Sequence, residues 1–148
     1  MRLVIQRVSQ ASVTVENSCV AQIGAGMLVL VGIHKDDTVA VVPVAIKKLL
    51  ALRIFPDEKH PINSAISEYN GEILAVSQFT LYANCWNGNR PSFDQAMAPE
   101  PAKQLYTYFF EELKRAYPRT ADGVFGAHMQ VCLVNDGPVT LIINFPNS

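Results

Sequence analysis

The sequence lacks an excess of charge of either sign. Its 12 lysines and arginines and 13 aspartates and glutamates leave a formal net charge of -1 over 148 residues. Proteins that hold nucleic acid across a wide surface usually carry a clear basic excess. The absence of this excess means that a nucleic acid could be held here only over a small, local footprint.

Cysteine is also scarce, with only Cys19, Cys85 and Cys132 in the chain. They are far apart, odd in number and form no CxxC pair, which excludes a disulfide framework and indicates a reducing compartment. The three histidines lack a metal-ligand spacing such as HxxxH. We therefore expect neither a metal nor another cofactor.

No hydrophobic run is long enough to cross a membrane. The longest, residues 27–31, is far shorter than the ~20 residues that span a bilayer. The first seven residues become polar too early for the apolar region of a signal peptide. The prediction is a cytoplasmic protein that does not engage a membrane.

The sequence does contain enough apolar material for a core. Hydrophobic residues make up 49% of the chain and charged residues 17%, which is typical of a folded domain and not of a disordered chain. No repeat, low-complexity tract or Gly/Ser linker divides it. We therefore predict a single domain over residues 1–148, a length typical of one domain.

Hydrophobic periodicity places strands and two helices along this domain. The predicted strands cover residues 3–8, 12–16, 19–23, 27–33, 72–81, 129–134 and 139–145, and the helices follow residues 36–38 and begin at residue 99. The order ββββ-α-β-α-ββ predicts a mixed α/β (α+β) fold: a layered domain with strand-rich sheets, a partial barrel and two packed helices. A doubly wound nucleotide fold, which alternates strands and helices regularly, is excluded.

The two predicted helices have recognisable starts and apolar faces. Any residue of 36–38 could cap the first helix, and Pro43 must lie in its first turn because an interior proline costs about 3 kcal/mol. The predicted buried positions are Ile46, Leu49 and Leu50 in the first helix and Leu105, Tyr108, Phe109 and Leu113 in the second.

The common catalytic motifs are missing. There is no P-loop and no GxSxG nucleophile elbow. Cys85 lies in a polar loop with no base beside it in sequence, so we interpret it as an inert thiol. A conventional serine, threonine or cysteine hydrolase acting on small esters stays an alternative. Trp86, in the same loop, could stack on a nucleobase or cap an apolar patch, and the sequence favours neither.

Two short segments carry more information. Residues 77–80, Ser-Gln-Phe-Thr, follow a buried strand, where backbone N–H groups and hydroxyls could face a pocket or simply leave the sheet. Residues 135–140, Asn-Asp-Gly-Pro-Val-Thr, place a proline where a tight Asp-Gly hairpin would normally lead into the next strand. Because about 5–6% of X-Pro bonds are cis in folded proteins, these residues alone do not predict a cis bond.

These segments belong to a resemblance that extends along nearly the whole chain. The sequence resembles the D-aminoacyl-tRNA deacylase family at residues 2–15 (RLVIQRVSQASVTV), 77–81 (SQFTL), 90–93 (RPSF), 125–129 (FGAHM) and 135–140 (NDGPVT). One such match would be weak, but several in order and at family spacing are strong. The resemblance implies a homodimer that hydrolyses the ester between the 3′-terminal adenosine of tRNA and a D-amino acid, or glycine mischarged on tRNA(Ala).

The resemblance also implies a site at the subunit interface. Its catalytic residues would be Ser77, Gln78, Phe79 and Thr80, and its substrate-binding residues Gly137, Pro138, Met129, Phe125, Ala127 and Arg7. A cis Gly137–Pro138 peptide would enter the pocket of the other subunit, hold the substrate's α-ammonium group and leave no room for an L side chain. The backbone amides of Phe79 and Thr80 would lie near the scissile carbonyl, Met129 and its neighbours would contact the adenosine, and Arg7 would fix the Gly-Pro loop.

Two points stay open at this stage. The attack on the ester could be assisted by the substrate's own ribose 2′-hydroxyl or made by Thr80, because an activated ester needs little beyond positioning and an oxyanion hole. The loop Asn84-Cys85-Trp86-Asn87-Gly88 also departs from the family, which carries Asp-Thr and a basic residue there, and His128 replaces a residue that is commonly acidic. Arg90 is the nearest remaining cation, so a non-catalytic binder of aminoacylated RNA 3′ ends is the alternative function.

Overall fold

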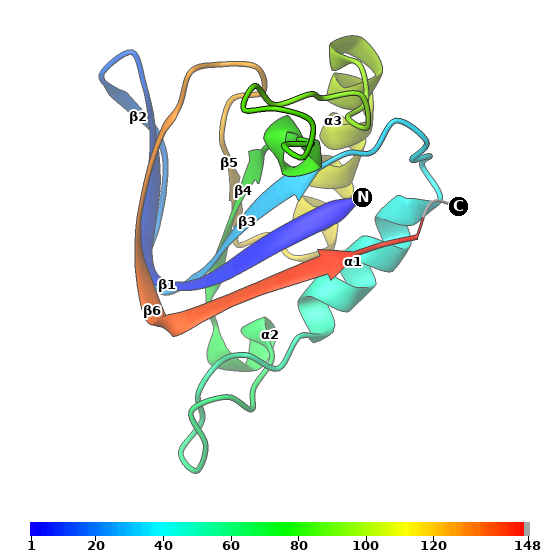
Figure 1. Cartoon of the computed structure of the whole chain (residues 1–148). Coiled ribbons are helices and arrows are strands. Elements are labelled where there is room, and N and C mark those ends of the chain that lie inside the picture. Colours follow the sequence, from blue (N-terminus) through cyan, green and yellow to red (C-terminus); the bar gives the residue numbers. More distant parts are fainter. Residues whose placement is uncertain (147–148) are drawn as a thin grey trace.

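The computed structural model describes residues 1–146 and contains one curved sheet with its two long helices packed together on one face (Figure 1). The elements are, in chain order, β1 (Arg2–Val15), β2 (Ser18–Ile23), β3 (Gly26–Gly32), α1 (Val41–Ala51), α2 (Ile66–Tyr69), β4 (Glu72–Ser77), the 3₁₀ helix η1 (Phe79–Tyr82), α3 (Pro99–Ala116), β5 (Thr120–Asp122) and β6 (Gln130–Asn144). The predicted α+β class is confirmed.

The sheet is organised around β1, which has three strand neighbours. The hydrogen-bonded order is β2-β1-β3-β4-β5, and β6 pairs with β1 along nearly its whole length. The first half of β1 pairs with β3 and the second half with β2, both antiparallel, whereas β3, β4 and β5 run parallel to one another. Because one long strand changes partners along its length, the sheet curls into a nearly closed barrel (Figure 1).

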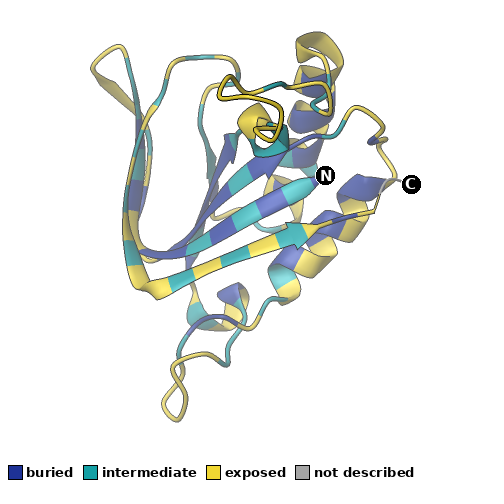
Figure 2. Ribbon diagram, in the orientation of Figure 1, coloured by how far each residue is buried: buried dark blue, intermediate teal, exposed yellow. Residues whose placement is uncertain are grey.

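The core has two parts, one on each face of the sheet. The larger packs Leu3, Val29 and neighbouring strand residues against Leu49 of α1 and Phe109 of α3. The smaller lies inside the curve and includes Val8 and Leu28, among others. β3 is covered on both faces, as its continuous apolar sequence predicts. The helix surfaces turned toward the sheet are buried, and their outer surfaces are exposed (Figure 2).

Two pairs of predicted strands are each a single strand. Residues 3–8 and 12–16 both belong to β1, because the exposed pair Ser9 and Gln10 marks a register shift against β6 and not a turn. Residues 129–134 and 139–145 likewise belong to β6. Between them, four residues (136–139) stand opposite Arg7 of β1, since Gln6 pairs with Thr140 and Val8 pairs with Asn135. The segment predicted to connect two strands is therefore a short insertion within β6, which we call the 136–139 excursion.

The sequence prediction also misplaced the end of one strand and missed two elements. β4 ends at Ser77 and not at residue 81, because the chain turns at Gln78 into the 3₁₀ helix η1. The four-residue helix α2 and the three-residue strand β5 were not predicted. Both are too short to show a period in the sequence.

The long helices follow the prediction with two exceptions. Pro43 lies in the first turn of α1, but the N-cap residue of that helix is Ala40, which makes no side-chain cap, and the Asp37 carboxylate binds the Met1 ammonium group instead. On α3, Tyr108 is exposed, and Tyr106 takes the buried place, because burial extends to the side of the helix that faces β5 and the 125–129 segment. In the described part of the chain, no helix is long and apolar enough to span a membrane.

Candidate functional site

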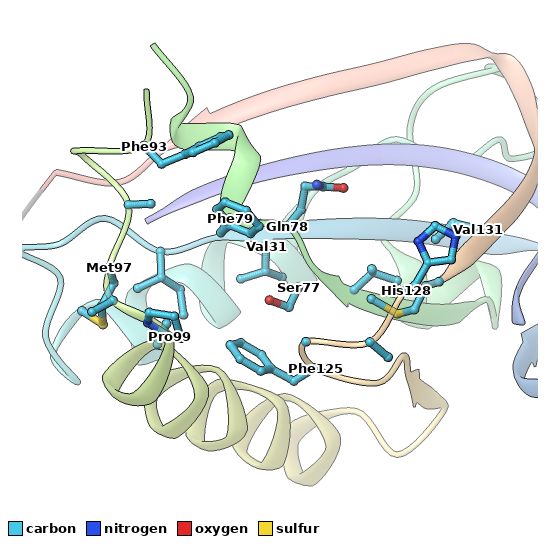
Figure 3. Close-up of a pocket in the computed structure, with 18 residues that line it drawn as sticks. Val31, Ser77, Gln78, Phe79, Phe93, Met97, Pro99, Phe125, His128 and Val131 are labelled. Atoms are coloured by element: carbon cyan, nitrogen blue, oxygen red, sulfur yellow. The ribbon is translucent and has the colours of Figure 1, made fainter. Parts of the chain in front are cut away.

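A cavity of about 660 Å³ lies between the sheet and the start of α3 (Figure 3). Its lining is mostly apolar, with a few polar groups, as is typical of binding pockets for small molecules. The lining residues are Val31, Ile33, Val76, Ser77, Gln78, Phe79, Phe93, Ala96, Met97, Ala98, Pro99, Ala102, Phe125, Gly126, Ala127, His128, Met129 and Val131. Six predicted site residues thus meet here: Ser77, Gln78, Phe79, Phe125, Ala127 and Met129.

The end of β4 forms one wall of the cavity. The N–H of Gln78 donates to the carbonyl of Val31 (2.8 Å), which is the last bond between this segment and β3. The backbone then leaves the extended conformation and tightens into η1. This turn leaves Ser77 and Gln78 half-buried against the cavity and Phe79 more than half exposed at its mouth.

The start of η1 presents unpaired backbone donors. The N–H groups of Phe79 and Thr80 have no acceptor among residues 1–146, because the first donors of a helical turn precede any intrahelical carbonyl. The side-chain amide of Gln78 donates to the Thr80 hydroxyl oxygen. Thr80 itself is exposed and does not line the cavity. The arrangement can stabilise a negative charge that develops on an oxygen beside Phe79.

The 93–99 segment forms the wall beside β3. The N–H of Met97 donates to the carbonyl of Ile33 (3.0 Å), and the N–H of Lys35 donates to the carbonyl of Gln95 (2.9 Å). The rings of Phe79 and Phe93 meet edge to face with centroids 5.0 Å apart. The sequence prediction gave this segment no site residue, because its Ala-Met-Ala-Pro stretch has only apolar side chains and no chemical signature.

Residues 125–129 form the opposite wall and are held from behind by α3 and β5. The rings of Tyr106 and Phe125 lie 5.8 Å apart, and the Tyr106 hydroxyl donates to the Asp122 carboxylate. Burial raises the pKa of Asp122, and burial together with this neighbouring carboxylate raises the pKa of Tyr106. The Val124 N–H points to the Met129 sulfur at 3.3 Å, which turns the segment back on itself. Asp122 and Tyr106 are supporting residues that the sequence did not reveal.

Arg7, Gly137 and Pro138 do not line this cavity. Arg7 is instead buried to 8% exposure beside the 136–139 excursion of β6, where its guanidinium donates to the carbonyls of Asp136, Ile54 and Pro61, each at 2.8 Å. The Asp136 carboxylate lies 3.7 Å from the same group. The predicted contact between Arg7 and the Gly-Pro loop is therefore present.

The excursion itself has a defined shape. Asn135 spans its base, because its side-chain oxygen accepts from the Val139 N–H (2.8 Å) and its amide donates to the Thr140 hydroxyl (3.0 Å). Gly137 has a φ of 154°, and a Cβ at this position would come within 2.6 Å of the Val139 nitrogen. The Gly137–Pro138 peptide is cis, as the resemblance implies.

The described residues contain no group of three or more His, Cys, Asp or Glu side chains that could hold a metal ion. Cys85 is an exposed free thiol outside the cavity. The chemistry available in the cavity is therefore that of backbone donors, one serine hydroxyl, one glutamine amide and His128.

Comparison with known proteins gives consistent results across the chain. Residues 4–144 match the family model described as D-Tyr-tRNA(Tyr) deacylase. Proteins named D-aminoacyl-tRNA deacylase from Protochlamydia amoebophila and Solibacter usitatus are each 50% identical over 143 residues, which cover 97% of this chain and 95% of theirs.

Two solved structures have the same fold. The structure titled c-Myc DNA Unwinding Element Binding Protein superposes with a TM-score of 0.93 at 42% identity, over 99% of both chains. A probable eukaryotic D-amino acid tRNA deacylase gives 0.86 at 21% identity, over 96% of this chain and 97% of that one, which supports the fold alone.

Proposed function

This chain belongs to the D-aminoacyl-tRNA deacylase family of ester hydrolases, and from its cavity we propose how it acts and on what. Its substrate is D-aminoacyl-tRNA, which it cleaves to a free D-amino acid and tRNA, and it also accepts glycine mischarged on tRNA(Ala). The observation that carries the proposal is the pair of unpaired N–H groups on Phe79 and Thr80 at the mouth of a mostly apolar cavity.

These donors supply the main catalytic interaction. Attack on the aminoacyl carbonyl places a negative charge on its oxygen, and two preorganised N–H groups stabilise that charge more strongly than they stabilise the neutral ester. Ser77 and Gln78 shape the same wall. Because no basic group of the described residues contacts the Thr80 hydroxyl, we assign assistance of the attack to the ribose 2′-hydroxyl of the substrate and not to Thr80.

The opposite wall binds the terminal adenosine. Phe125 and Met129 provide apolar faces for a base, and Ala127 is small enough to leave room beside them. The hydrogen bond between Tyr106 and Asp122 holds this wall in place from behind. The cavity then binds the 3′ end of a tRNA and few of its phosphates, which suits the near-neutral charge of the chain.

Selection against L-aminoacyl esters comes from Gly137 and Pro138. Their carbonyls would hold the α-ammonium group, and their backbone would occupy the space of an L side chain, so that D-amino acids and glycine fit and L-amino acids clash. Arg7 and Asn135 make this loop rigid. Because the loop does not line the cavity of its own chain, we propose a homodimer in which each loop enters the cavity of the other copy. The enzyme acts in the cytoplasm, where tRNA is aminoacylated.

A matched time course on D-Tyr-tRNA and L-Tyr-tRNA, with EDTA present throughout, tests the proposal. We expect rapid loss of the D ester alone, and strong loss of this activity in Ala127→Phe, whose larger side chain would fill the cavity. Equal hydrolysis of both esters would indicate an unselective esterase. Protection of both esters from spontaneous hydrolysis would instead support a non-catalytic binder of aminoacylated RNA ends.

A further inference from the structure

Trp86 is the only tryptophan in the chain, and 94% of its surface is exposed. Large aromatic side chains are rarely left so fully in water, because burying their apolar surface is favourable. The exposure also excludes one of the two interpretations left open by the sequence, that Trp86 caps an apolar patch of its own chain. A contact outside the described chain is the remaining interpretation.

The loop that carries Trp86 is anchored at both ends to the cavity. It leaves the end of η1, whose first residue Phe79 lines the cavity, and it returns at Phe93, which also lines it. Reciprocal backbone hydrogen bonds between Asn84 and Ser92 (2.8 and 2.9 Å) close its base, and the Trp86 N–H donates to the Asn84 side chain (3.0 Å). Figure 1 shows this loop directly above η1.

The distance to Trp86 is short from η1, the helix that begins at Phe79 at the mouth of the cavity. Trp86 is four positions after Tyr82, the last residue of η1, so the two Cα atoms lie at most ~14 Å apart. A polynucleotide whose 3′ end enters the cavity beside Phe79 and Phe93 would pass this loop, which joins the two residues. Arg90, in the same loop, is exposed, and its guanidinium has no hydrogen bond or ion pair within residues 1–146. An exposed aromatic ring and a free cation in one loop are features of surfaces that bind single-stranded nucleic acid.

We propose that Trp86 stacks on an unpaired nucleobase of the tRNA acceptor end, on the 5′ side of the terminal adenosine, while Arg90 contacts an adjacent phosphate. This inference rests on the proposed function, since it takes the 3′ end of a tRNA as the occupant of the cavity. Stacking on a ring tolerates any base, so the contact adds affinity for the acceptor end without reading its sequence.

Because Trp86 is the single tryptophan of the chain, the fluorescence of the protein reports on its surroundings. We expect an uncharged RNA hairpin with a single-stranded 3′ overhang to quench the fluorescence of the wild-type protein, and the same hairpin with a blunt end to leave it unchanged. An emission maximum that shifts to shorter wavelength as protein concentration rises, without RNA, would overturn the proposal, because Trp86 would then be covered by a second copy.

Kinetics separate this proposal from the function on which it rests. Trp86→Ala should raise the KM for D-Tyr-tRNA by about 5- to 150-fold, the equivalent of 1–3 kcal/mol, with kcat unchanged. Trp86→Phe should retain most of the affinity, and all variants should hydrolyse D-tyrosyl-adenosine equally. The matched control is Tyr108→Ala, another exposed aromatic, on the outer side of α3.

Failure of the stacking contact and failure of the proposed deacylase function give different results. An unchanged KM in Trp86→Ala, alongside D-selective hydrolysis by the wild type, would overturn the stacking contact and leave the deacylase intact. Quenching by the overhang without hydrolysis of any ester would support the contact and contradict the deacylase.

Discussion

Asp37 shows how one buried carboxylate can organise the start of the chain. Its oxygens accept from the Met1 ammonium group (2.6 Å) and from the backbone N–H of His34 (2.7 Å), and the side chains of Met1 and Asp37 are fully buried. The attraction between these two buried charges compensates for the hydration that each has lost, whereas either charge alone would be buried with neither water nor a counter-charge. Its charge also joins burial as a cause that raises the pKa of Tyr82 to about 12.

We predict that Asp37→Asn lowers the free energy of unfolding by about 3–5 kcal/mol, because the ammonium group would stay buried without a counter-charge. Urea denaturation measures the change. Asp36→Asn is the matched control, since the neighbouring carboxylate is mostly exposed and its contact with His34 should contribute at most about 1 kcal/mol. Equal losses in the two variants would contradict the role given to the buried pair.

At the scale of single residues, the sequence predicted the place of some residues and not of others. The interpretation of 36–38 as a helix cap is wrong for Asp37, because its carboxylate binds the Met1 ammonium group instead. The sequence could not show this contact, since only the fold brings the two residues together. Ser77 and Phe79 could be placed in a pocket through the resemblance, while the residues alone left a plain strand exit open. The free N–H groups at η1 could not be predicted, because they depend on where β4 stops.

At the scale of elements, long periodic segments were predictable and short or bent ones were not. The face of α3 was recognised because its length shows a period, and β3 was recognised because its apolar run is continuous. β5, with three residues, has no period, and it stays in the sheet through its parallel pairing with β4. β5 matters for the cavity, because it ends in Asp122, which receives the Tyr106 hydroxyl from α3.

This contact between α3 and β5 predicts a pH dependence. Burial raises the pKa of Asp122 above its ordinary 3.8, and the hydrogen bond from Tyr106 only partly opposes the shift. The folded protein therefore holds this proton more tightly than the unfolded chain, so the free energy of unfolding should fall as pH rises from about 3.8 through the raised value. Asp122→Asn removes the titrating group and keeps an acceptor for Tyr106. The free energy of unfolding of this variant should therefore not show this fall with rising pH.

Urea denaturation at a series of pH values measures the effect. Relative to wild type, Asp122→Asn should gain stability on going from pH 3.5 to pH 7, and the exposed Glu111→Gln on α3 should not. A wild-type profile that rises with pH more steeply than that of Asp122→Asn would show that the carboxylate is stabilised in its charged form and would contradict the assignment.

At the scale of the whole molecule, the cavity and the 136–139 excursion are separate features of one chain. Ser77 and Phe79 line the cavity, whereas Gly137, Pro138 and their anchor Arg7 do not. Apart from the resemblance, the sequence could not predict this separation, because motif order carries no information about which groups face each other. If the two features serve one reaction, the complete site needs two copies, each supplying one half.

Mixing two inactive variants tests this directly. Gly137→Ala disturbs the loop, because its Cβ would meet the Val139 nitrogen at a positive φ, and Ala127→Phe fills the cavity. Each variant alone should lose most D-Tyr-tRNA hydrolysis while keeping a wild-type circular dichroism spectrum. In a heterodimer, the intact cavity of one copy meets the intact loop of the other, so unfolding and refolding the two together should restore about a quarter of wild-type activity.

Whether the mixture recovers activity depends only on which chain supplies the loop to each cavity. If each loop served the cavity of its own chain, every chain in the mixture would still carry one defective half, and no recombination of subunits could restore activity. If loops are exchanged, half of the randomly formed dimers are mixed, and each of these has one complete site and one site defective in both halves. Recovery that grows with the mixed fraction would therefore establish a shared site, and an inactive mixture of well-folded dimers would contradict it.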